Sequence, residues 1–295
     1  MTQPSLLKNL RQVFEIDKHP LRLLSAEPAI PRDSNLQRLT FSSHGGEEIR
    51  AFYLPAQGIT PGPAIVYIHA HGGRYDIGAD ELMNGRPSLN GPLGPVLAEM
   101  GFAVLCIDLP GFGGRAQVSE SALAKKALWF GRSLAGQMIG ELHSAFQWLS
   151  KQDGVDPTRV GLFGISMGAT LAYWLAAAEP RVAALANLCC FANLDGLIET
   201  GAHDLHGIYL TVPGLLKIAS NGKIAASISP RPQFVGIGDQ DPLTPRRATD
   251  PALAELRIGY RDAMQNLQIF RDQNTGHTET PDMRRGVVEF FKSAL

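Results

Sequence analysis

One serine in this chain has the surroundings of a catalytic nucleophile. Residues 164–168 read Gly-Ile-Ser-Met-Gly, with a short apolar run at 159–163 before them and a helix-forming stretch at 169–178 behind them. A strand, a sharp turn and a helix in this order form a nucleophile elbow, in which the turn raises the serine hydroxyl above the end of a central sheet. Glycines are needed on both sides, because a Cβ there would collide with a neighbouring strand or helix. The chain contains 31 glycines, so the pentapeptide alone can arise by chance, and the flanking pattern is what makes Ser166 a candidate.

Two later loops supply the partners that such a serine needs. A base must take the hydroxyl proton and an acid must orient that base, and behind this kind of elbow the acid precedes the base along the chain. His277 follows a predicted last strand at 267–271 and is the only histidine after position 206. Asp239 and Asp241 both follow a predicted strand at 233–237. We favour Asp241 as the acid because Pro242 pushes it toward extended geometry, which leaves Asp239 as a turn residue bonded to its own backbone.

Acyl transfer also requires hydrogen-bond donors for the oxyanion that forms on the substrate. The residue after the nucleophile normally gives one N–H, here that of Met167, and the loop after an early strand gives the other. An apolar stretch at 64–69 leads into Ala-His-Gly-Gly-Arg at 70–74, where glycine allows close approach of the backbone. We expect Gly73 to be the second donor, with Gly72 and Arg74 as alternatives.

Taken together, these segments resemble the α/β-hydrolase superfamily, and within it the dienelactone-hydrolase-like and acetyl-xylan-esterase-like serine hydrolases. The resemblance extends from about residue 36 to the C-terminus. It is carried by residues 69–76 and 108–113, the elbow, Gly238-x-x-Asp241 and Gly276-His277. Dienelactone hydrolases proper use a cysteine nucleophile, whereas this elbow carries Ser166. The resemblance therefore implies a serine esterase that acts on a small acyl ester through a Ser166–His277–Asp241 triad, without a metal or cofactor.

The order of predicted elements indicates one α/β domain. Residues 1–35 are expected to form an N-terminal helical extension, with a short amphipathic helix within 4–14, and residues 36–295 the hydrolase domain. Strands are predicted at 36–42, 49–54, 64–69, 103–108, 159–165, 182–188, 233–237 and 267–271, and helices near 95–100, 125–149, 169–178, 247–265 and 281–294. Apolar strands that alternate with helices predict a mostly parallel, eight-stranded sheet covered on both faces. Residues 191–230 interrupt this alternation and are expected to form a small cap-like insertion, or else an irregular connection away from the site.

Six residues are candidates for the substrate pocket: His71, Arg74, Phe112, Phe191, His206 and Tyr209. Trp129 could also line it, although aromatic residues in such a chain usually belong to the core. Arg115 could clamp a substrate carboxylate or form a structural ion pair. The pairs His69/His71 and His203/His206 could be imagined as metal ligands, but we expect no metal, because such short histidine pairs are common by chance.

Composition restricts the classes of partner. The 295 residues are 44% hydrophobic and 19% charged, with a formal net charge of −1, so neither nucleic acid nor an anionic membrane is an expected partner. The three cysteines give no disulfide framework, residues 1–20 resemble neither a signal peptide nor an anchor, and a cytoplasmic location is expected. The oligomeric state stays open and is compatible with a homodimer. A peptidase, thioesterase, acyltransferase, lactone hydrolase or carbon–carbon hydrolase would use the same site, and a non-hydrolytic ligand-binding protein would keep the same pocket.

Overall fold

The computed structural model describes residues 3–29, 35–58 and 60–295. In this part of the chain nine strands form one sheet in the order β1-β2-β3-β5-β4-β6-β7-β8-β9. The strands are β1 (Arg22–Pro28), β2 (Gln37–Ser42), β3 (Glu48–Leu54), β4 (Gly62–Ile68), β5 (Ala103–Ile107), β6 (Val155–Ile165), β7 (Leu185–Leu188), β8 (Gln233–Gly238) and β9 (Leu267–Asp272). The first three strands pair antiparallel, β3 also runs antiparallel to β5, and the strands from β5 through β9 pair in parallel.

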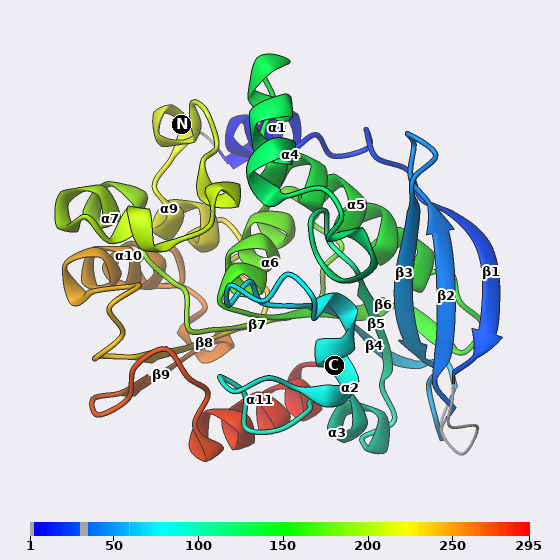
Figure 1. Ribbon diagram of the computed structural model, residues 1–295. Coiled ribbons are helices and arrows are strands. Elements are labelled where there is room, and N and C mark those ends of the chain that lie inside the picture. Colours follow the sequence, from blue (N-terminus) through cyan, green and yellow to red (C-terminus); the bar gives the residue numbers. More distant parts are fainter. Residues whose placement is uncertain (1–2, 30–34, 59) are drawn as a thin grey trace.

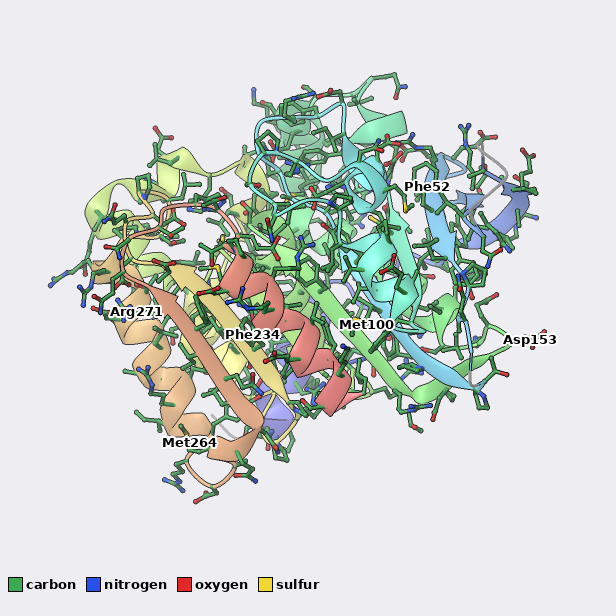
Figure 2. The ribbon with its side chains drawn as sticks, turned by 90° about the horizontal axis from the view of Figure 1, so that it is seen from below. Phe52, Met100, Asp153, Phe234, Met264 and Arg271 are labelled. Atoms are coloured by element: carbon green, nitrogen blue, oxygen red, sulfur yellow. The ribbon has the colours of Figure 1, made fainter. Side chains whose placement is uncertain are left out.

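Helices cover both faces of this sheet (Figure 1). They are α1 (Gln3–Val13), α2 (Glu81–Asn84), α3 (Gly94–Glu99), α4 (Glu120–Trp129), α5 (Leu134–Leu149), α6 (Met167–Ala178), α7 (Leu194–Thr200), α8 (Leu215–Ile218), α9 (Asn221–Ala226), α10 (Arg246–Gly259) and α11 (Pro281–Ala294). Helices α1, α5, α6, α9 and α10 lie on one face and α3 and α11 on the other (Figure 1). Figure 2 looks onto the second face, where α11 lies along the strands and Phe234 of β8 contacts Phe290 of α11, with ring centroids 5.9 Å apart. The predicted α/β-hydrolase architecture is confirmed.

The ninth strand, β1, was not predicted. Its side chains are exposed along almost the whole strand, so the sequence lacks the apolar alternation that marks a half-buried strand. It lies at the edge of the sheet and pairs only with β2. Residues 30–34, directly before the predicted domain boundary at 35, lie outside the described residues.

The single helix predicted at 125–149 is two helices. Gly131 adopts a positive φ of 67° behind α4, which ends that helix. Ser133 then caps α5, because its hydroxyl accepts a hydrogen bond from the Gly136 N–H at 2.9 Å. Helix α4 consequently projects from the body of the molecule (Figure 1), and only Glu120 and Ala124 of its residues are buried.

The region 191–230 contains α7, α8, α9 and two short 3₁₀ turns, Ala202–Leu205 and Ile208–Leu210. It follows β7 and therefore leaves the sheet at the carboxyl ends of the parallel strands, where ligands bind in open α/β sheets. Within the described residues, no helix is both long and apolar enough to cross a membrane.

Helix α1 is tied to the turn between α4 and α5 by a buried carboxylate. Glu15 accepts hydrogen bonds from the Arg132 guanidinium at 2.5 and 2.8 Å, and His19 Nε2 lies 3.1 Å away. Burial alone would raise the pKa of Glu15, but the hydrogen bonds from His19 and Arg132 outweigh it and lower this pKa to about 2. Because the pKa of this carboxyl is depressed in the folded state, its contribution to stability is fully present above the unfolded value of 4.5 and is lost as the pH falls toward 2.

We therefore expect Glu15→Gln to lower the free energy of unfolding by about 3 kcal/mol at pH 7. The difference from the unmodified protein should shrink between pH 4.5 and pH 2, as measured by urea unfolding at several pH values. Glu27→Gln on the exposed strand β1 is the control and should show no such change. A pH-independent difference for Glu15→Gln would contradict the linkage.

Candidate active site

Ser166 sits at the sharp turn between β6 and α6. Its φ of 57° and ψ of −121° are a conformation that residues with a side chain rarely adopt. A Cβ on Gly164 would collide with the carbonyl of Gly168, and one on Gly168 with the carbonyl of Ile68 at the end of β4. The Ser166 N–H donates to the Leu188 carbonyl at 2.9 Å, which fixes the turn to β7. The geometry is that of the elbow predicted from the sequence.

The loops after β6, β8 and β9 bring three side chains together. His277 Nε2 lies 2.8 Å from Ser166 Oγ, and His277 Nδ1 lies 2.7 Å from Asp241 Oδ2. The Asp241 side chain is 1% exposed and that of His277 is 20% exposed, so the histidine reaches solvent while the carboxylate does not. A hydroxyl, an imidazole and a buried carboxylate in this order are the arrangement that activates a serine.

Asp241 is held as a carboxylate by three groups. Besides His277, the Leu243 N–H donates to Oδ1 at 2.9 Å and the Thr244 hydroxyl donates to Oδ2 at 2.8 Å. Burial alone would raise the pKa of Asp241. The hydrogen bond from His277, the charge of His277 and the other two donors outweigh burial and lower this pKa. The group is therefore ionised at neutral pH and can keep a proton on His277 Nδ1.

Asp239, the alternative acid, is engaged elsewhere. Its carboxylate pairs with Arg271 Nε of β9, and Arg246 lies 4.0 Å away. The structure therefore brings Asp241 to His277 and leaves Asp239 in an ion pair. The sequence suggested that Asp239 bonds its own backbone. The ion pair was not predicted, because Arg271 lies 32 residues further along the chain than Asp239.

The predicted oxyanion donors differ in their availability. Met167 is the first residue of α6, where the N–H groups have no partner within the helix. The Gly73 N–H, however, donates to His71 Nδ1 at 3.1 Å, and the Arg74 N–H donates to the His71 carbonyl at 3.1 Å. Both N–H groups are therefore engaged in this conformation, and the expectation that Gly73 is the second donor stays a prediction that this conformation does not favour.

Among the described residues, no acceptor is present for the amides of His71 and Gly72. Of these two residues, His71 is nearer to His69 along the chain. The His69 carbonyl packs against Gly168 of the elbow. The sequence analysis did not consider the His71 amide, because glycine was taken as the sign of close backbone approach.

The predicted pocket residues fall into two groups. Phe112, Phe191 and Tyr209 are fully buried; the first and last pack against the His71 ring, and Phe191 packs against Tyr173 of α6. His206 is half-buried, and its Nε2–H donates to the Leu243 carbonyl at 2.8 Å. Burial lowers the pKa of His206, which lies close enough to His277 to sense its charge. The turns at 202–210 therefore lie against the acid loop.

Two arginines that sequence reasoning considered for substrate binding form ion pairs. Arg74 is exposed and pairs with Asp76 at 2.7 Å. Arg115 is buried, and its guanidinium bonds Glu141 of α5 and Glu47 of the β2–β3 turn, each at 2.6 Å. Arg115 thus has the structural role that the sequence left open.

The histidine pairs do not converge as metal ligands. His69 Nδ1–H donates to the Ala70 carbonyl at 2.9 Å, and its Nε2 accepts from the Leu109 N–H at 3.2 Å. Both nitrogens of His71 are also hydrogen-bonded, and His203 is exposed. In the described part of the chain no three potential ligands are grouped as a metal would require.

Comparison with known structures agrees with this fold. The structure of a putative acetyl xylan esterase from Bacteroides fragilis has a TM-score of 0.71 at 16% identity, and the match covers 95% of this chain and 76% of that one. Acetyl xylan esterase 1 from Thermoanaerobacterium has a TM-score of 0.66 at 19% identity over 99% of this chain and 93% of its own. At these identities the likeness shows the fold alone, which is the α/β-hydrolase fold.

The family follows from the sequence. Residues 49–229 match the family described as X-Pro dipeptidyl-peptidase (S15 family), and the chain belongs to it. The putative hydrolase YtaP from Bacillus subtilis is 33% identical over 97% of this chain and 98% of its own length. The protein is accordingly a hydrolase.

The geometry predicts different outcomes for two aspartates in one loop. Asp241→Asn should reduce kcat by about 10⁴-fold, because an amide stabilises the wrong tautomer of the base. Asp239→Asn should leave kcat close to that of the unmodified protein, since its carboxylate pairs with Arg271. Equal losses in the two variants, measured with an activated ester, would show that Asp241 does not orient His277.

Proposed function

We propose that this chain is a serine hydrolase that cleaves the carboxylic ester of a small acyl group through an acyl-enzyme. The observation that carries the proposal is the continuous hydrogen-bonded path from Ser166 Oγ through His277 to Asp241, with contacts of 2.8 and 2.7 Å. A serine in a strained turn, with its base in place and a buried acid behind it, has no simple structural purpose. Structures of this fold that are described as acetyl xylan esterases support the same chemistry for this chain.

The reaction follows from these positions. Ser166 Oγ attacks the ester carbonyl carbon while His277 Nε2 takes the hydroxyl proton, and Asp241 stabilises the imidazolium that results. His277 then gives this proton to the leaving alcohol, and the acyl group stays on Ser166. Water, deprotonated by His277, attacks the acyl-enzyme, and the carboxylic acid leaves as Ser166 recovers its proton. The residues supply the nucleophile, base and acid, so the proposed reaction requires no cofactor.

The Met167 and His71 N–H groups are the proposed oxyanion donors. They come from the two chain segments that meet at Gly168, the elbow and the end of β4. Each donor of this kind typically lowers the barrier by about 3–4 kcal/mol.

Peptide hydrolysis is the second candidate, and the family description supports it. An enzyme that removes a dipeptide must hold the free ammonium group of its substrate, for which an unpaired carboxylate is the natural partner. Three carboxylates near the site are already engaged: Asp241 with His277, Asp239 with Arg271, and Glu120 with three donors. This favours a substrate without a fixed cation, such as a neutral ester.

We expect Ser166→Ala and His277→Ala to reduce turnover of p-nitrophenyl acetate by about 10⁴–10⁶-fold each. The losses should be similar because the triad acts as a unit. A fluorophosphonate probe should form its adduct on Ser166, located by peptide mass spectrometry, and Gly-Pro-p-nitroanilide should be a poorer substrate than the ester.

Either variant with the rate of the unmodified protein would refute the triad. A folded protein that forms no adduct would make a non-hydrolytic ligand-binding role the better proposal. Faster cleavage of the anilide than of the ester would favour the peptidase.

A further inference from the structure

We propose that Glu120 is a positioning residue for the loop at 69–75, termed the oxyanion loop, and that it acts through the imidazole of His71. The inference rests on the proposed function, since it assigns a role in the same site. Glu120 lies 49 residues from His71 along the chain and touches neither Ser166 nor His277 in the hydrogen-bond network.

The Glu120 carboxylate joins three separate segments. Its Oε2 accepts from His71 Nε2–H at 2.9 Å and from the Tyr75 hydroxyl at 3.0 Å, both in the oxyanion loop. Its Oε1 accepts from the Tyr209 N–H at 2.9 Å, in the region that follows β7. Glu120 itself begins α4 and is only 4% exposed. A buried carboxylate with three donors from two other segments is a fixed point to which the oxyanion loop is attached.

This contact sets the tautomer of His71. An ionised carboxylate only accepts hydrogen bonds, so His71 Nε2 must carry a proton. His71 Nδ1 in turn accepts from the Gly73 N–H at 3.1 Å, and it can do so only without a proton. Burial alone would raise the pKa of Glu120, but its hydrogen bonds to His71, Tyr209 and Tyr75 outweigh it, and this pKa is lowered. Glu120 therefore stays ionised and holds His71 in the tautomer that engages Gly73.

The same contact decides which amide of the loop can serve the reaction. With Gly73 turned toward the His71 ring and Arg74 bonded to the His71 carbonyl, the loop closes on itself around His71. The N–H groups of His71 and Gly72 are left without an acceptor among the described residues. Of the two, we assign the donor role to the His71 N–H, because His71 is nearer along the chain to His69, whose carbonyl lies against Gly168 of the elbow. Glu120 thus maintains the loop conformation in which that N–H is available.

Packing leaves the His71 ring no alternative position. Its centroid lies 5.1 Å from that of Phe112 and 5.2 Å from that of Tyr75, and Tyr209 is 5.9 Å away. A Cβ on Gly207 would overlap both His71 Nε2 and Glu120 Oε1, so only glycine fits beside the pair. Such tight enclosure indicates that the pair is built to hold one geometry.

Glu120→Gln tests the proposal. The Tyr209 backbone N–H requires an acceptor, so the introduced amide turns its oxygen to Tyr209 and its NH2 group to His71. His71 must then move its proton to Nδ1, and the Gly73 N–H loses its acceptor. We expect kcat for p-nitrophenyl acetate to fall about tenfold to hundredfold, below the loss from removing an oxyanion donor outright. KM should change less than about twofold, because the lost interaction acts in the transition state.

Two further readouts separate positioning from a merely structural role. The ¹⁵N chemical shifts of the His71 ring should show Nε2 protonated in the unmodified protein and Nδ1 protonated in Glu120→Gln. His71→Asn should place an amide oxygen where Nδ1 lies and accept from Gly73 without help from Glu120. In that background Glu120→Gln should therefore cost less than about threefold in kcat, a strongly non-additive result.

Glu179→Gln is the matched control. Glu179 also forms a buried pair with a histidine, His143, at 2.8 Å, but it follows the last residue of α6, at the opposite end of that helix from Ser166. The Glu179→Gln protein should be less stable than the unmodified protein, whereas the His71 tautomer and kcat should not change.

The proposal is overturned if Glu120→Gln keeps its kcat, if only KM changes, if the His71 tautomer stays as it was, or if the effects of Glu120→Gln and His71→Asn simply add. Failure of the proposed function is a separate outcome, in which the unmodified protein forms no adduct on Ser166 and does not turn over the ester.

Discussion

The backbone conformation of Ser166 is the constraint on which the rest of the site depends. A non-glycine residue at φ 57° costs about 1–3 kcal/mol and persists only where its surroundings enforce it. Here the enforcement comes from a helix buried at every position, α6, and from the hydrogen bond between the Ser166 N–H and Leu188. The elbow also needs the two glycines, since the end of β4 and the start of α6 approach too closely for any side chain. The favourable burial of α6 thus offsets the backbone strain at Ser166, and this strained conformation is what exposes the Ser166 hydroxyl.

The positions of the acid and base follow from the register of the last two strands. Gly238 pairs with Asp272 at the ends of β8 and β9, and beyond them the Asp239 and Gln240 N–H groups donate to the carbonyls of Asp272 and Thr275. A Cβ on Gly238 would collide with the Thr275 carbonyl, so the two loops lie in direct contact. Backbone hydrogen bonds therefore fix the two loops to each other. The contact between Asp241 and His277 then requires little further ordering of their side chains.

Local patterns in the sequence were sufficient for the alternation of strands and helices and for the placement of Ser166, His277 and Asp241 at strand ends. Each of these inferences uses residues that lie within a few positions of one another. Strand β1 escaped because its side chains are exposed, and the break between α4 and α5 depends on one glycine φ. The partner of Asp239 and the role of Glu120 are contacts between distant segments, and neither has a local signature. The hydrogen bond of the Gly73 N–H also has no local signature, because it depends on the tautomer of the His71 ring, which Glu120 sets.

The oxyanion loop is held from two sides by carboxylates that come from different parts of the fold. Glu81 is fully buried, accepts from the Ala70 N–H at 3.0 Å and from the Tyr67 hydroxyl at 2.8 Å, and pairs with Arg86, so it belongs to the core. Glu120 instead comes from α4, a helix that is otherwise largely exposed. The nucleophile, base and acid depend on core strands, whereas part of the loop geometry depends on an outlying helix and on residues 207–209. Substitutions in α4 or in the region after β7 can therefore change the rate of the reaction while the triad keeps its geometry, which makes these segments the natural place for related proteins of this fold to differ.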